Sequence, residues 1–215
     1  MVQVISASEL TLNEVETKFH LQQAEEEKFF SEWQENLPEI SEEEKQYLDQ
    51  VKADFLYLNK YPLFEEAVKM VVLSPLLTLA GFYRTPFRIS EEVPVQIAVK
   101  EEGQILRGRI DILVIQEQFW VLVIESKQAS FSLKNGIAQA LVYLVATPNQ
   151  SQAVFGMVTN GSHFIFLKLM LGETSQYALS DEFSLLRRGN DLSAVLGILK
   201  HIGKLIQPGF FIDMV

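Results

Sequence analysis

The sequence contains no cysteine among its 215 residues. Disulfide bonds and cysteine-ligated metals are therefore excluded, and a reducing cytoplasm is the compartment we expect. Long hydrophobic runs are missing as well, because the most apolar stretch, residues 70–82, is interrupted by Ser74, Pro75 and Thr78. This stretch falls short of the ~20 residues that a membrane-spanning helix needs. We therefore expect no membrane segment, and residues 1–12 lack the pattern of a signal peptide.

Motifs of several common enzyme classes are absent. The sequence has no G-x-x-x-x-G-K-[ST] phosphate-binding loop and no G-x-S-x-G segment, so a nucleotide-driven motor and a serine hydrolase lack support. Its histidines, His20, His163 and His201, lie far apart and share no metal-ligand spacing. We expect them to be ordinary structural residues.

A broad basic surface is also lacking. The chain carries a net charge of -10, and its first 50 residues, with 13 acidic and 3 basic side chains, account for all of it. This distribution counts against tight non-specific DNA binding by the chain alone. The glutamate runs 25–27 and 42–44 fit solvated helix faces, and a docking surface for a basic partner is the alternative.

What the sequence does contain is enough apolar residues for a sizeable core, at 48% of the chain. We expect an acidic helical arm over residues 1–60 and one domain over residues 61–215. Capping signals predict the arm helices: Asn13 with Glu16 for residues 13–36, and Ser41 with Glu44 for residues 41–60.

The rest of the chain alternates between strand and helix patterns. Apolar residues recur with a period of two in residues 93–99 and form apolar runs in the next two strands. The expected order is a helix at 63–79, strands at 93–99, 110–115 and 120–124, a helix at 133–146, strands at 153–158, 164–170 and 177–185, and a helix at 192–206. This order predicts a mixed α/β sheet flanked by helices, with an N-terminal helical arm.

Charged side chains stand at the ends of two neighbouring apolar strands. Asp111 interrupts one strand, and Glu125, Ser126 and Lys127 follow the next. If the hairpin between them turns near residues 117–118, Asp111 faces Glu125 or its neighbour, with opposed Cβ atoms ~4.5–5.5 Å apart. Two carboxylates this close repel each other unless a divalent cation lies between them. Carboxylate, carbonyl and water ligands suit Mg²⁺ or Mn²⁺.

Lys127 completes this constellation. Residues two apart in a strand point to the same side, so Lys127 shares a face with Glu125. An ammonium beside a metal-bound water orients that water and stabilises charge on a phosphate. Together with Asp111, these residues predict a site that hydrolyses phosphodiesters. The alternative is that all three are strand-end charges and that the glutamate and lysine pair with each other.

The spacing Asp111, thirteen residues, Glu125-Ser126-Lys127 resembles the D…(D/E)-x-K signature of the PD-(D/E)xK nuclease superfamily. Ile110 stands where the name-giving proline would be, which departs from the literal pattern. The resemblance implies a restriction-endonuclease-like fold and a DNA-cleaving nuclease that uses Mg²⁺ or Mn²⁺. It also implies that Asp111 and Glu125 bind the metal, together with the Ser126 carbonyl, while Lys127 is catalytic.

Flanking motifs extend the resemblance. Gln139 and Tyr143 match the Q-x-x-x-Y motif of RecB-like members, which implies a place near the site or the DNA backbone. A capping glutamine and a half-buried tyrosine are the alternative. Upstream, the segment beginning at Glu65 is similar to the first helix of the N-terminal nuclease domain of type I restriction motor subunits. A glutamate there helps to bind metal in the family, and Glu65 matches better than Glu66. A simple i,i+4 salt bridge from Glu65 to Lys69 is the alternative.

These expectations combine into a metal-dependent deoxyribonuclease with a role in restriction or repair. A different class is also compatible with the sequence: a nuclease-fold module without activity that binds a protein partner through its acidic helices. The amphipathic pattern of residues 13–60 also permits a homodimer.

Overall fold

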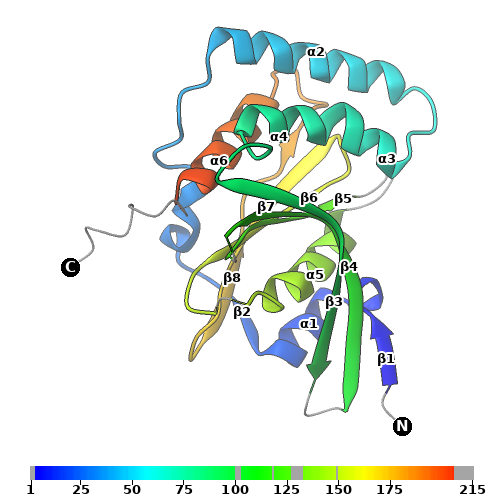
Figure 1. Ribbon diagram of the computed structural model, residues 1–215, viewed down its shortest axis with the longest axis vertical. Helices are drawn as coiled ribbons and strands as arrows, with labels where there is room; N and C mark the ends of the chain where they lie inside the picture. Colours follow the sequence, from blue (N-terminus) through cyan, green and yellow to red (C-terminus); the bar gives the residue numbers. More distant parts are fainter. Residues whose placement is uncertain (1–2, 100–102, 118, 127–132, 149, 206–215) are drawn as a thin grey trace.

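The computed structural model describes residues 3–99, 103–117, 119–126, 133–148 and 150–205. A twisted sheet of nine strands runs through the molecule, and helices cover both of its faces (Figure 1). The strands are β1 (Gln3–Ser6), β2 (Leu21–Gln23), β3 (Phe87–Val99), β4 (Gln104–Gln116), β5 (Phe119–Ser126), β6 (Val154–Thr159), β7 (His163–Met170), β8 (Ser175–Leu179) and β9 (Phe183–Ser184).

The sheet is mixed. Its main path is β1-β4-β5-β6-β7-β8-β2, with β3 also paired to β4 and β9 to β7. The β3–β4 and β4–β5 pairs are antiparallel, and β5 and β6 run parallel. A crossover through α5 joins the parallel pair, as parallel neighbours require. β5 therefore lies inside the sheet with both neighbours paired, which explains its continuous apolar sequence.

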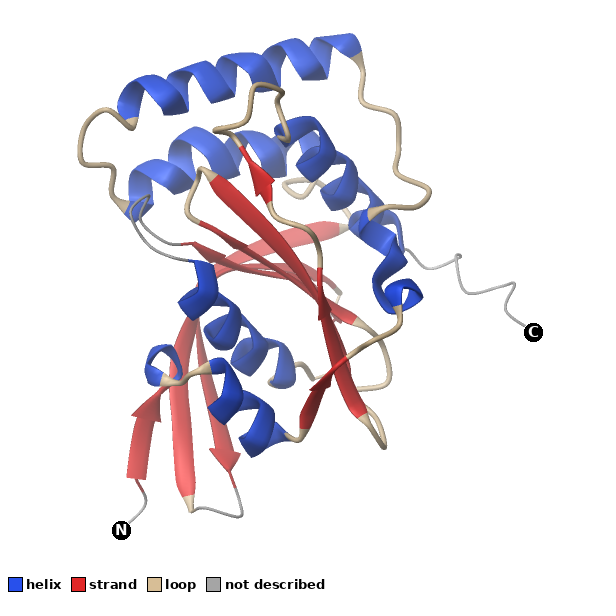
Figure 2. Cartoon of the chain, turned by 180° about the vertical axis from the view of Figure 1, so that it is seen from behind, coloured by secondary structure: helices blue, strands red, loops and turns tan. Residues whose placement is uncertain are grey.

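Two layers of helices enclose the sheet, as the view from behind also shows (Figure 2). The principal helices are α1 (Leu12–Phe19), α2 (Glu42–Leu58), α3 (Glu65–Val68), α4 (Ser74–Ala80), α5 (Leu133–Val145) and α6 (Leu192–Leu205). One core cluster contains buried residues of α2, α4 and α6, and the other contains buried residues of α1 and α5. This is the mixed α/β architecture that the restriction-endonuclease-like resemblance implies. In the described part of the chain, no helix is both long and apolar enough to cross a membrane.

The prediction of a single helix over residues 13–36 is wrong. Thr11 caps α1 through a reciprocal bond with Glu14, two residues earlier than the expected pair, and His20 ends the helix in a left-handed conformation. The chain then forms β2 and a 3-10 helical segment, η2 (Glu27–Trp33). Pairing of β2 with β8 explains the change, because its hydrogen bonds to a distant strand replace those of a continued helix.

The other expected elements are present with shifted ends. Ser41 caps α2 with Glu44, as the sequence predicts. The helix at 63–79 is α3 and α4, joined by a π-helical turn, η3 (Lys69–Leu73). The strand expected at 177–185 is divided into β8 and β9.

Residues before position 60 are integrated into the sheet. β1 pairs with β4, β2 pairs with β8, and α2 buries Leu48, Val51 and Phe55 in a shared core cluster. The division of the chain into an arm and a domain stays a prediction, but this segment is packed on the structure that carries the candidate site.

Candidate active site

Asp111 and Ser126 connect the two strands that carry the site. The antiparallel register pairs Ile112 with Ile124, and its continuation places Asp111 opposite Glu125. At this point the backbone N–H of Ser126 donates a hydrogen bond of 2.7 Å to the Asp111 carboxylate. The predicted hairpin register is therefore present, and the two acids stand side by side, with Asp111 in the middle of β4 and Glu125 near the end of β5.

Both carboxylates are sheltered from solvent. Glu125 is 1% exposed, and the side chain of Asp111 is 14% exposed. Ser126 is buried, and its hydroxyl has no hydrogen-bond partner among the described residues. Lys127, the predicted catalytic lysine, lies outside the described residues.

The donor chemistry of this pair fits Mg²⁺ or Mn²⁺. Within the described ranges, no group of three or more His, Cys, Asp or Glu side chains is arranged to hold a metal ion. Mg²⁺ does not need such a cage, since one or two carboxylates usually hold it and water and substrate phosphates complete its shell. Asp111 and Glu125 supply those carboxylates, and the Ser126 carbonyl is the further candidate ligand.

Lys69 links the third acid to this pair. Its ammonium lies 2.8 Å from the Glu65 carboxylate and 3.9 Å from each of the Asp111 and Glu92 carboxylates. Burial lowers the pKa of Lys69, but the hydrogen bond to Glu65 and the charges of Asp111, Glu65 and Glu92 outweigh it, so the pKa lies above its usual value. Lys69 therefore remains a cation at neutral pH.

The position of Glu65 follows from these contacts. The i,i+4 salt bridge that was its alternative explanation is formed, and the same lysine brings Glu65 toward Asp111. Glu66 is exposed. Glu65, at the first residue of α3, is thus the acid of this helix that faces the site.

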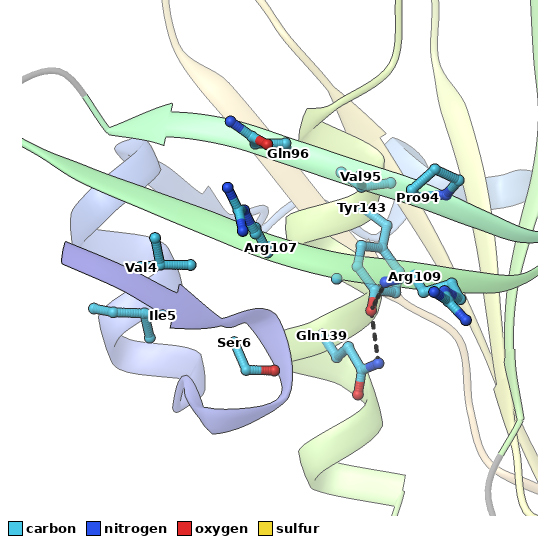
Figure 3. A pocket seen from close by; sticks show the side chains of 11 residues that line it. Val4, Ile5, Ser6, Pro94, Val95, Gln96, Arg107, Arg109, Gln139 and Tyr143 are labelled. Atoms are coloured by element: carbon cyan, nitrogen blue, oxygen red, sulfur yellow. Dashed lines mark hydrogen bonds between the residues drawn. The ribbon is translucent and has the colours of Figure 1, made fainter. Parts of the chain in front are cut away.

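Gln139 and Tyr143 form a hydrogen-bonded unit beneath the carboxylates. The Gln139 side-chain amide donates to the Tyr143 hydroxyl at 2.8 Å (Figure 3), and the backbone N–H of Arg109 donates to it at 3.1 Å. Gln139 lies in the middle of α5, and Tyr143 is 1% exposed. The alternative interpretation, in which Gln139 caps the helix and Tyr143 is only half-buried, is therefore wrong.

The environment of Tyr143 connects it to the acids. Burial is the largest cause that raises its pKa, to about 12, and the negative charges of Glu125 and Asp111 act in the same direction, whereas the bonds from Gln139 and Arg109 act in the opposite direction. The hydroxyl therefore stays protonated at neutral pH. It remains a neutral hydrogen-bonding group within the electrostatic influence of both carboxylates.

Gly108 makes room for this tyrosine. A Cβ atom at position 108 would lie 2.5 Å from the Tyr143 ring and 2.6 Å from its hydroxyl. The sequence patterns predict neither Gly108 nor Lys69 as a member of the site. Glycine three residues before the strand carboxylate is a visible signal for a close approach, whereas the contact of Lys69 with Asp111 depends on folding.

One family comparison bears on this site. The family described as type I restriction enzyme R protein N terminus matches residues 10–174, which is more than half of the chain. The matched range contains every candidate site residue, from Glu65 to Tyr143. No curated protein matches the sequence.

Proposed function

The chain belongs to the family of type I restriction enzyme R protein N-terminal regions, and from this premise we propose that it is a nuclease domain that hydrolyses DNA phosphodiester bonds with Mg²⁺ or Mn²⁺. One observation carries the proposal: the bond from the Ser126 N–H to Asp111 holds this carboxylate, in the middle of β4, beside Glu125 near the end of β5. Two sheltered acids in this position have little structural use without a cation.

Each side chain has a distinct role in the proposed reaction. Asp111 and Glu125 hold the metal, with the Ser126 carbonyl as a further ligand, and Lys127 positions the attacking water. Glu65, paired with Lys69, supports Asp111 from the side of α3. Bound metal supplies an activated water and stabilises charge on the phosphate.

Gln139 and Tyr143 are the proposed substrate contacts. The protonated Tyr143 hydroxyl accepts hydrogen bonds from Gln139 and Arg109, so its own proton remains for donation toward an acceptor such as a phosphate oxygen. These residues do not reach the reacting bond in this proposal. They orient the DNA backbone relative to the carboxylates.

The contacts of Lys69 favour a second candidate function, that of a binding module without enzymatic activity. Its ammonium already offsets the charges of Glu65 and Asp111, so the acids are partly neutralised without metal. A nuclease-fold module without activity would keep this arrangement and bind a protein partner or a second copy through the acidic face of α2. Metal binding separates the two functions.

The experiment is a calorimetric titration of Mn²⁺ into the wild type and into Asp111→Asn and Glu125→Gln. We expect one saturable site in the wild type that either substitution removes. Glu173→Gln is the control, because Glu173 is exposed on the turn before β8 and should leave binding unchanged. Equal Mn²⁺ binding by wild type and Asp111→Asn, or none by either, would favour the module without activity.

A further inference from the structure

A cleft of about 830 Å³ opens beside Tyr143 (Figure 3). Its walls come from β1, β3, β4 and α5, and its polar lining includes Gln96, Arg107, Arg109 and Gln139. Among the residues that the structure describes, no acidic one lines it. In a chain with a net charge of -10, a concave surface that carries two arginines and no acid is a local exception.

The two arginines follow one edge of this cleft. Arg107 and Arg109 are two residues apart in β4 and so project to the same side of the strand, roughly 6.6 Å apart at their Cα atoms. Such a spacing is comparable with that of consecutive phosphates along an extended nucleic-acid strand. Both arginines are exposed, so an anion can reach them without rearrangement of the core.

The cleft lies next to the candidate active site along β4. The backbone N–H of Arg109 donates to Tyr143, and Asp111 follows two residues later on the same strand. Tyr143 therefore lies between the cleft and the carboxylate pair. A strand whose phosphate lies at Asp111 and Glu125 would continue along β4 toward Arg109 and then Arg107.

Glu92 limits the charge that this surface presents. It pairs with the Arg109 guanidinium at 3.3 Å, and both side chains are more than half exposed. An exposed pair of this kind stabilises a protein little, so a phosphate can compete for the arginine. Glu92 thus lowers the affinity of the cleft without closing it.

We propose that this cleft binds the sugar-phosphate backbone of one nucleic-acid strand next to the bond that is cleaved. Arg107 and Arg109 bind two successive phosphates, and Gln96, which lies opposite Arg107 in the β3–β4 register, donates a hydrogen bond to the same backbone. The contacts are to phosphate and sugar, so they position the strand without selecting its sequence. This inference rests on the proposed nuclease function, which supplies the reason for a nucleic-acid strand at this place.

Fluorescence anisotropy with a labelled oligothymidylate in EDTA tests the cleft separately from cleavage. We expect Arg107→Gln/Arg109→Gln to bind roughly tenfold more weakly at low salt. The slope of log K against log salt should fall by about 1.4, because each phosphate contact on a single strand contributes about 0.7. Glu92→Gln should bind more tightly than the wild type. Arg187→Gln/Arg188→Gln, which removes two exposed arginines between β9 and α6, should match the wild type.

The outcomes distinguish the cleft from the nuclease function. The proposed role of the cleft in binding a strand would be overturned by equal affinity and equal salt slope in the wild type and the Arg107→Gln/Arg109→Gln variant. It would also be overturned if the wild type did not bind the oligonucleotide. Binding that depends on Arg107 and Arg109 supports the proposed role of the cleft, even if the wild type fails to cleave the same DNA with Mn²⁺. That combination would reject the nuclease function alone. Thermal melting of each variant verifies that it is folded.

Discussion

Lys69 contacts Asp111 across the space between helix and sheet, with its ammonium 3.9 Å from the carboxylate. The same ammonium is 2.8 Å from Glu65. The candidate site therefore contains a cation from the chain itself beside the carboxylate that is proposed to bind metal. This arrangement keeps the acids compatible with folding when no metal is bound, and it makes Lys69 a competitor of the metal.

Replacing Lys69 with methionine tests this competition. The side chain of Lys69 is 23% exposed, so its loss should cost about 1–3 kcal/mol of unfolding free energy, between an exposed and a buried ion pair. Mn²⁺ should bind the variant at least roughly tenfold more tightly, because a unit charge ~4 Å away interacts by several kcal/mol at intermediate dielectric. Denaturant unfolding and Mn²⁺ titration measure the two effects.

The matched control is Lys45→Met. Lys45 also pairs with a glutamate on its own helix, Glu42, at 2.6 Å, but both side chains are largely exposed and far along the chain from the site. Mn²⁺ affinity should not change in this variant. Weaker Mn²⁺ binding by Lys69→Met than by the wild type would show that Lys69 supports the metal site instead of competing for it.

A methyl group at position 108 should displace Tyr143. A Cβ there would lie 2.5 Å from the tyrosine ring, so Gly108→Ala should cost about 1–3 kcal/mol of stability through overpacking. The cost should largely vanish in a Tyr143→Ala background, because the clash has no partner there. Gly189→Ala, where a Cβ meets nothing within 4 Å, is the control. Additive costs in the double-mutant cycle would contradict the contact.

The hydroxyl of Tyr143 should remain protonated far into the alkaline range. Its pKa is raised to about 12 by burial and by Glu125, whereas an unfolded tyrosine titrates near about 10. Below the unfolded pKa the contribution of Tyr143 to stability is complete, and it is lost as the pH rises from there through about 12, since only the unfolded state releases the proton. The stability difference between wild type and Tyr143→Phe should therefore shrink in this range.

Unfolding free energies at alkaline pH, together with tyrosinate absorbance, measure this effect. At neutral pH, Tyr143→Phe should cost about 1–3 kcal/mol, because the Arg109 N–H and the Gln139 amide lose their acceptor. A stability difference that is independent of pH, or a tyrosinate signal from Tyr143 near the ordinary pKa, would contradict the buried position beside Glu125.

The centre of the sheet was predictable because its signals are local. A lone Asp111 in an apolar strand, a short polar turn and a second apolar strand ending in Glu125 determine the hairpin register within a residue. The turn between β6 and β7 has a local signal too, the dipeptide Asn160-Gly161, and this glycine has a φ of 83°, which a residue with a side chain rarely adopts.

The N-terminal segment was mispredicted because its structure depends on distant partners. Residues 13–36 have helical spacing and no proline, but β2 pairs with β8 about 150 residues away. No local pattern encodes that pairing. For the same reason, the contact between Lys69 and Asp111 and the cleft along Arg107 became visible only when separate elements were placed together.

The proposed nuclease function requires that Asp111, Glu125 and Lys127 form a metal-dependent centre that cleaves DNA. The most direct measurement is cleavage of plasmid and single-stranded DNA with Mn²⁺ by the wild type and by Asp111→Asn, Glu125→Gln and Lys127→Ala, with Glu173→Gln as the control. We expect cleavage by the wild type and the control, with none in EDTA, and a loss of roughly a hundredfold or more in each site variant. Cleavage that persists in the folded Asp111→Asn protein, or a folded wild type that cleaves neither substrate, would contradict this proposal.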